Sequence, residues 1–181
     1  RLITAWYASA MTADPGEERV EWIDDEGHVI EVVTRSRLRT ENLRHRSVAV
    51  IVTTTSGRLV VQRRAETKDV YPGWWDIGAG GVVTSGEDLA VAARRELAEE
   101  LGVDARPEYV CVERFENDQA REICSVYRLV HDGPFHPADG EAVEIRAVDP
   151  DEFADLAARA PFLPGSLAML LPHVPEFAEA V

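Results

Sequence analysis

The sequence predicts an α/β (α+β) fold, an α/β/α sandwich around a mixed central sheet. Short segments rich in Val, Ile and Thr fill much of the first half of the chain. One long amphipathic helix follows at residues 86–101, and strand-like and then helical segments complete the chain. This order is typical of a sheet with helices on both faces. The length of 181 residues favours one domain at residues 20–181, after a flexible tail at residues 1–19.

The individual elements follow from turn residues and hydrophobic period. Strands are expected at 20–24 and 28–34, joined by Asp25-Glu26-Gly27, with a short helix at 36–43. Two more strands are expected at 47–55 and 58–62, and a loop at 66–75 precedes a glycine-rich stretch at 76–83. Strands at 108–115, 122–131 and 142–148 and helices at 151–159 and 166–171 complete the prediction.

The long helix has clear start and stop signals. Ser85 can cap a helix that begins at Gly86, Glu87 and Asp88 stand in its first turn, and Gly102 ends it after Leu101. This segment is therefore the best-defined element of the sequence.

The charge balance limits the kinds of partner. The chain has 19 basic and 33 acidic residues, a net charge of −14, which disfavours binding to nucleic acid or to anionic membranes. No apolar run approaches the ~18 residues of a membrane span. Cys111 and Cys124 form no CxxC pattern, which favours reduced thiols and a cytoplasmic location.

Three carboxylates share one side of the long helix. Glu96, Glu99 and Glu100 fall within an arc of about 100°, where like charges repel. A bound cation removes this repulsion, and several carboxylate oxygens favour a hard ion, Mg²⁺ or Mn²⁺. The alternative is a solvated acidic face, with Arg94 and Arg95 making surface ion pairs.

The apolar face of the helix predicts where these carboxylates lie. Leu89, Ala93, Leu97 and Leu101 step by four and lie beside the acidic arc, not opposite it. The carboxylates are therefore expected at the seam between helix and sheet.

The surrounding pattern resembles a known family. Gly81, five residues, Glu87, seven residues and then Arg95-Glu96-Leu97-x-Glu99-Glu100-x-Gly102-Val103 match the complete Nudix box. The resemblance implies the Nudix fold and a hydrolase of small diphosphate substrates that uses Mg²⁺ or Mn²⁺. It also implies pairing of Glu87 with Arg95, which holds the loop in place. The implied metal ligands are the Gly80 carbonyl and the carboxylates of Glu96, Glu99 and Glu100.

Other candidate site residues lie outside the box. Arg63 and Arg64 follow a strand and are expected to steady a phosphate, or else to be an edge-strand solubility pair. Trp75 is a candidate for stacking on the substrate, with core packing as the alternative. The general base is expected to be a box glutamate or, before the last strand, Glu141 or Glu144.

A narrower resemblance covers most of the chain. Leu43-x-His45-Arg46, Gln62-Arg63-Arg64 and Thr67-Lys68 are similar to the branch of Nudix proteins related to isopentenyl-diphosphate isomerase. That isomerase needs a cysteine and a histidine where this chain has Gly80 and Val82, so hydrolysis is favoured.

Two alternatives to the hydrolase stay open at this point: the isomerase, and a nucleotide-binding Nudix module without catalysis. A homodimer is also a possible state, since many members of the family dimerise.

Overall fold

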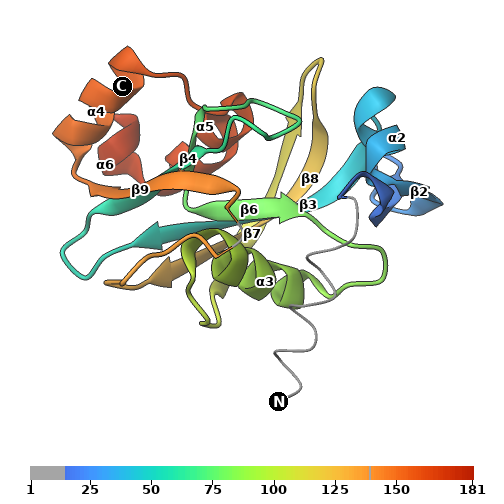
Figure 1. The fold of residues 1–181 in the computed structure, drawn as a ribbon, viewed down its shortest axis with the longest axis horizontal. Helices are drawn as coiled ribbons and strands as arrows, with labels where there is room; N and C mark the ends of the chain where they lie inside the picture. Colours follow the sequence, from blue (N-terminus) through green and yellow to red (C-terminus); the bar gives the residue numbers. More distant parts are fainter. Residues whose placement is uncertain (1–14, 139) are drawn as a thin grey trace.

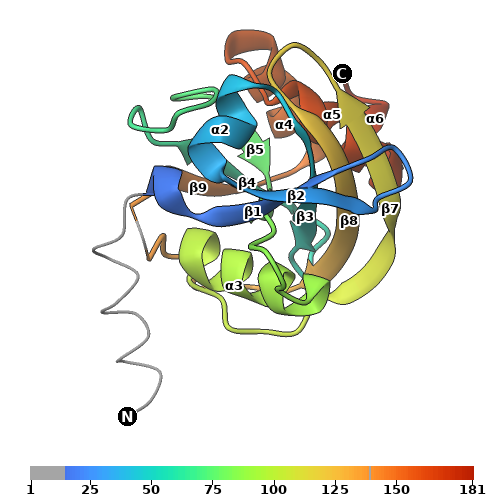
Figure 2. The same cartoon turned by 90° about the vertical axis from the view of Figure 1, so that its right-hand side faces the viewer.

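The computed structural model describes residues 15–138 and 140–181, which form one mixed sheet between helical layers. In Figures 1 and 2, α3 lies on one side of the sheet and α4, α5 and α6 lie on the other. The strands are β1 (Arg19–Ile23), β2 (Val29–Thr34), β3 (Arg44–Thr53), β4 (Leu59–Arg64), β5 (Trp75–Ile77), β6 (Ala79–Val82), β7 (Glu108–Glu116), β8 (Arg121–Val130) and β9 (Ala142–Val148). The helices are η1 (Pro15–Glu17), α2 (Arg35–Thr40), α3 (Leu89–Leu101), α4 (Pro150–Arg159), α5 (Pro164–Leu170), η2 (Leu171–His173) and α6 (Pro175–Ala178). The predicted α/β/α arrangement with a mixed sheet is thus confirmed.

Strand β3 is the centre of the sheet. It pairs with β8 in parallel along its whole length, and with β1, β4 and β6 in antiparallel fashion. Val48, Val50 and Val52 point into the core under α3, whereas Ala49 and Ile51 point into the core under α4–α6. The period-2 alternation of a strand buried on both faces explains why this segment is almost continuously apolar.

The sequence prediction was wrong about where α3 begins. The helix starts at Leu89, and the side chain of Asp88 caps it by accepting from the backbone N–H groups of Ala90 and Val91. Gly86 has φ of +77°, which a helix cannot contain, so the turn of residues 85–88 stays outside the helix. The predicted stop is correct: Gly102 takes the left-handed conformation and its N–H bonds to the last turn.

The N-terminal hairpin and α2 form a small third cluster. Val20, Val33 and Leu38 are buried together against Leu43 and Val82. The end of the predicted tail differs from expectation, because residues 15–17 form η1 and Arg19 already belongs to β1. Residues 1–14 lie outside the described part of the chain.

Candidate functional site

The box carboxylates lie at the seam between α3 and the sheet. Glu96 and Glu100 are only 7% and 2% exposed, on the same side of the helix as the buried Leu97. Glu99 is partly exposed, with its side chain 26% accessible. The prediction of a carboxylate seam is therefore correct, and a surface acidic face is excluded for Glu96 and Glu100.

Arg95 relieves much of the repulsion between these carboxylates. Its Nη1 donates to Glu96 at 2.7 Å and to Glu99 at 3.0 Å, and its Nε and Nη2 each donate to Glu87 at 3.0 Å. Burial alone would lower the pKa of Arg95, but Glu87 and the two box carboxylates raise it overall, so the guanidinium is permanently charged. The predicted pairing of Glu87 with Arg95 is present, and it joins the loop before α3 to the helix.

The two buried carboxyl groups hold protons more tightly than usual. Burial raises the pKa of Glu96, with Arg95 opposing the shift. Burial, reinforced by the charge of Glu96, raises the pKa of Glu100. Glu100 Oε2 accepts from Gln62 Nε2 at 2.6 Å and from Gly80 N at 2.9 Å. A cation that joins two such neighbouring carboxyls would stabilise their charged forms beyond what Arg95 provides to Glu96.

The glycines of β6 let its backbone approach these groups. A Cβ on Gly81 would lie 2.3 Å from Glu96 Oε1, so only glycine leaves room for that carboxylate. Gly80 donates its N–H to Glu100 rather than to β3. Because the N–H and C=O of one strand residue point to the same side, the Gly80 carbonyl also faces away from β3.

A cavity of about 790 Å³ opens beside this seam. Its wall includes Glu96 and Glu99 of α3 and the neighbouring Gly80 and Gly81 of β6. Much of the remaining lining comes from α2, β3, β8, the loop after β4 and α5. A volume of this size accommodates a nucleotide-sized ligand.

Besides Arg95 and His45, four basic side chains line the same cavity: Arg35, Arg39, Arg64 and Lys68. We call them the cationic cluster. The Nε–H groups of its three arginines are buried and make no hydrogen bond within the described part of the chain. Arg35 and Glu96 lie close enough for the charge of each to raise or lower the pKa of the other. The cavity thus has carboxylates and guanidinium groups within reach of one ligand.

The rest of the cavity wall is partly polar and buried. Ser166 Oγ donates to Asp76, whose pKa is raised by burial against the opposing charge of Arg64. Ser47 Oγ donates to Glu122 at 2.7 Å. His45 Nδ1 bonds to the Leu43 carbonyl at 3.0 Å, while burial lowers the pKa of the ring and keeps it neutral.

Some predicted site residues lie elsewhere. Trp75 is 3% exposed and stacks on Phe162 in the core under α4–α6, so core packing is its role. Arg63 lies on the opposite face of β4 from Arg64 and pairs with Glu144 at 3.4 Å. Glu144 also pairs with Arg146, and neither it nor Arg63 is among the lining residues of the cavity. Arg64 does line the cavity.

Several cavity residues were not predicted from the sequence. Arg35 and Arg39 stand one helical turn apart on α2, with Arg37 on its outer face paired to Glu31 and Glu41. The i, i+4 spacing of Arg35 and Arg39 was the available signal. Asp76 and Tyr71 gave no such signal, because their positions depend on how the loop at residues 65–74 folds back on the sheet.

Comparison with known proteins identifies the family. The NUDIX domain matches residues 43–168. The chain is 36% identical over 162 residues to the Uncharacterized Nudix hydrolase PA4841 of Pseudomonas aeruginosa, covering 89% of this chain and 96% of that one. It is 38% identical over 158 residues to the Uncharacterized Nudix hydrolase YfcD of Escherichia coli K12, covering 83% and 84% of the two chains.

Solved structures agree at the level of the fold. DR0079 from Deinococcus radiodurans aligns with a TM-score of 0.66 and 26% identity, over 80% of this chain and 92% of that one. The NUDIX domain of Shewanella oneidensis NrtR, solved with ADP ribose, aligns with a TM-score of 0.56 and 14% identity over 81% and 98% of the two chains.

The helices of the described residues are all too short or too polar to span a membrane. The chain belongs to the Nudix family and is a Nudix hydrolase.

Proposed function

We propose that this enzyme is a divalent-metal-dependent pyrophosphohydrolase that holds a diphosphate between the α3 carboxylates and the cationic cluster. The observation that carries the proposal is the buried carboxyl of Glu96, on the wall of a cavity that also has three arginines with buried Nε–H groups, and with the buried carboxyl of Glu100 one helical turn away. Such opposed charges suit a ligand with its own negative groups and a bridging cation.

The residues fit a hard metal ion. The oxygens of Glu96, Glu99 and Glu100, with the Gly80 carbonyl, would supply an all-oxygen donor set of the kind that Mg²⁺ and Mn²⁺ prefer. Burial raises the pKa of Glu96 and of Glu100 despite the opposing charges of Arg95 and Lys68, so a bound cation would further stabilise their charged forms. When bound, the ion neutralises diphosphate oxygens and lowers the pKa of a water.

The cationic cluster would hold the phosphate farther from α3. Nε–H groups on Arg35, Arg39 and Arg64 that make no hydrogen bond among the described residues suit the fork geometry by which guanidinium groups bind phosphate oxygens. Lys68 adds a point charge and is itself held by an ion pair with Glu141. These contacts would orient the leaving phosphate and stabilise the charge that develops on it.

Two cavity carboxylates are our candidates for the base that takes the proton of the attacking water. Glu99 is partly exposed at the end of the box, and Glu141 lines the cavity beside Lys68. After the proton leaves, the water oxygen bonds to one phosphorus while the bridging oxygen departs with the other phosphate. Isomerisation of a prenyl diphosphate is disfavoured, because Gly80 and Val82 supply no acid or base at the start of the box.

The test is a screen of diphosphate compounds with Mg²⁺ and with Mn²⁺. The panel contains sugar-linked nucleoside diphosphates, dinucleoside polyphosphates, nucleoside triphosphates and isopentenyl diphosphate, and phosphate release is read after a phosphatase step. We expect metal-dependent cleavage of at least one compound, abolished by Glu100→Gln and kept by Glu108→Gln, an exposed substitution on β7. Full activity of Glu100→Gln, or a product of isopentenyl diphosphate with only its double bond moved, would contradict the proposal.

A further inference from the structure

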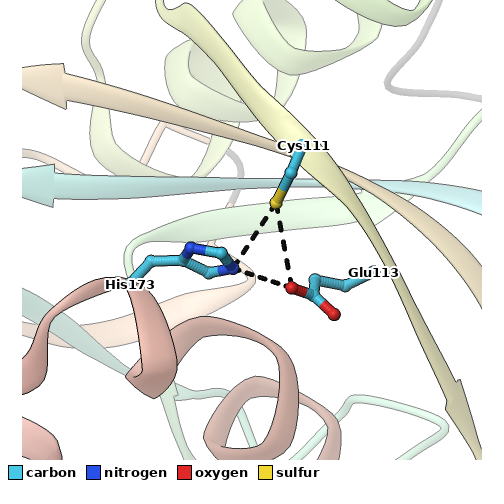
Figure 3. Close-up of side chains that lie close together, drawn as sticks. All are labelled: Cys111, Glu113 and His173. Atoms are coloured by element: carbon cyan, nitrogen blue, oxygen red, sulfur yellow. Dashed lines mark hydrogen bonds and ion pairs between the residues drawn. The ribbon is translucent and has the colours of Figure 1, made fainter.

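A second cluster of metal-ligating side chains lies away from the cavity. Cys111 and Glu113 stand on β7, and His173 is the last residue of η2. Figure 3 shows the three side chains converging, with the thiol and one carboxylate oxygen turned towards the same edge of the imidazole ring. None of the three is among the lining residues of the cavity.

We propose that Cys111, Glu113 and His173 form a binding site for Zn²⁺ or a similar transition-metal ion. The three donor atoms lie close together: Cys111 Sγ to His173 Nε2 is 3.4 Å, Cys111 Sγ to Glu113 Oε1 is 3.8 Å, and His173 Nε2 to Glu113 Oε1 is 2.9 Å. In tetrahedral zinc sites, the usual bond lengths separate such ligand atoms by about 3.4–3.6 Å. The ligand triangle is therefore nearly preformed.

The size of this triangle suits the ion itself. For sides of 2.9, 3.4 and 3.8 Å, the point equidistant from the three corners lies about 2.0 Å from each. Zinc bonds are about 2.0–2.3 Å long, so an ion slightly out of the plane reaches all three atoms without movement of the backbone. A water molecule would supply the fourth ligand of the ion.

Two other arrangements of these residues are less consistent with the geometry. In a cysteine–histidine catalytic pair the acidic partner holds the ring nitrogen that the thiol does not contact. Here both the thiol and the carboxylate approach the same atom, Nε2. A simple His173–Glu113 ion pair explains the 2.9 Å contact but leaves the approach of Cys111 Sγ to both partners unexplained. Three donors facing one point is the arrangement of a metal site.

The local fold supports both access and rigidity. Cys111 and Glu113 are two apart on one strand, so their side chains share a face. Glu113 and His173 have side chains 35% and 25% accessible, so an ion can enter from solvent. Strand β7 pairs only with β8 among the described strands, and the site joins this edge strand to the C-terminal helices. Because η2 directly follows α5, whose residues line the cavity, a bound ion would also steady that wall.

The donor set separates this site from the α3 site. Thiolate and imidazole select zinc-like ions, whereas the carboxylates of α3 select Mg²⁺ or Mn²⁺. On binding, the Cys111 thiol releases its proton to solvent and becomes a thiolate ligand. The two sites can therefore be filled independently in one sample.

The test uses Co²⁺ as a spectroscopic probe for the full chain, with excess Mg²⁺ to fill the α3 site. We expect one equivalent of Co²⁺ to give a thiolate-to-cobalt charge-transfer band together with visible bands of four-coordinate cobalt, and Zn²⁺ to displace it. Cys111→Ser should abolish the charge-transfer band. Glu113→Gln and His173→Gln should each weaken binding by at least about tenfold.

Matched variants control for other sites. Cys124→Ser removes the other, buried cysteine, and His28→Gln disrupts the exposed group of Asp24, Glu26 and His28. Both should keep the cobalt spectrum of the parent protein. Thermal melting of each variant without added transition metal establishes that it is folded. A charge-transfer band that survives in Cys111→Ser, a band lost in Cys124→Ser, or no one-equivalent binding to the folded parent would overturn the proposal.

Discussion

Substitution of Gly81 by alanine should damage the site while sparing the fold. The new Cβ would lie 2.3 Å from Glu96 Oε1, 2.6 Å from its Cδ and 2.8 Å from Oε2. Ordinary contact begins at 3.4 Å, so the carboxylate oxygen must move by about 1.1 Å. The carboxylate ends a flexible side chain and can move, and we expect the free energy of unfolding to change by less than about 1 kcal/mol. A displacement of ~1 Å in a reacting assembly lowers turnover by about 10²-fold.

The assay is kcat for Mg²⁺-dependent phosphate release, measured beside thermal unfolding. Gly57→Ala is the matched control, because Gly57 has φ of +80° and no atom lies within 4 Å of the place that its new Cβ would occupy. That change should strain the backbone by about 1 kcal/mol and leave kcat unchanged. The reasoning is refuted if Gly81→Ala keeps the parent kcat. It is also refuted if thermal unfolding shows a loss of folded protein large enough to account for the loss of activity.

Three further predictions concern the cavity and its charges. Arg39→Ala should lower kcat/KM by about 10–100-fold through loss of a phosphate contact. Arg37→Ala, on the outer face of α2, should leave kcat/KM within twofold of the parent value. Both values are measured by titration of the substrate. Glu141→Gln should lower kcat by about 10²-fold if that residue is the base, and Glu144→Gln much less; equal losses would reject this assignment. Burial raises the pKa of both buried box carboxyls above the ordinary value of 4.5, so the folded state keeps their protons to higher pH than the unfolded chain. Without metal, the free energy of unfolding should therefore fall as pH rises from 4.5 to the raised pKa values of the folded state, by up to about 1.4 kcal/mol per pH unit for each group. Chemical denaturation at several pH values measures this slope, and saturating Mg²⁺ should remove it.

The parts of the site that depend on one helix were predictable from sequence. The positions of Glu96 and Glu100 at the seam were predictable because they are four residues apart and lie beside the apolar Leu97. Helix geometry fixes these relative positions. The link between Glu87 and Arg95 came from the resemblance to the family, and the structure contains it.

The parts that depend on long-range packing were not predictable. Arg63 and Arg64 differ in role because adjacent residues of a strand face opposite sides, and the sequence did not indicate which side holds the cavity. The pairing of β4 with β9 also shifts its register between Arg63, which is opposite Glu144, and Arg64, which is opposite Ala142. Trp75 packs in the core against Phe162, which lies 87 positions later in the chain.

The ion pairs of Arg95 with three carboxylates have a consequence for how the proposed metal ion would bind. In the metal-free molecule this guanidinium acts as a built-in counterion for Glu87, Glu96 and Glu99. Because these pairs do not involve an ion, the loop and the helix stay joined without one, and the proposed ion would bind by an exchange of hydrogen-bond partners around Arg95. Uptake and release of the ion would then leave the surrounding fold in place.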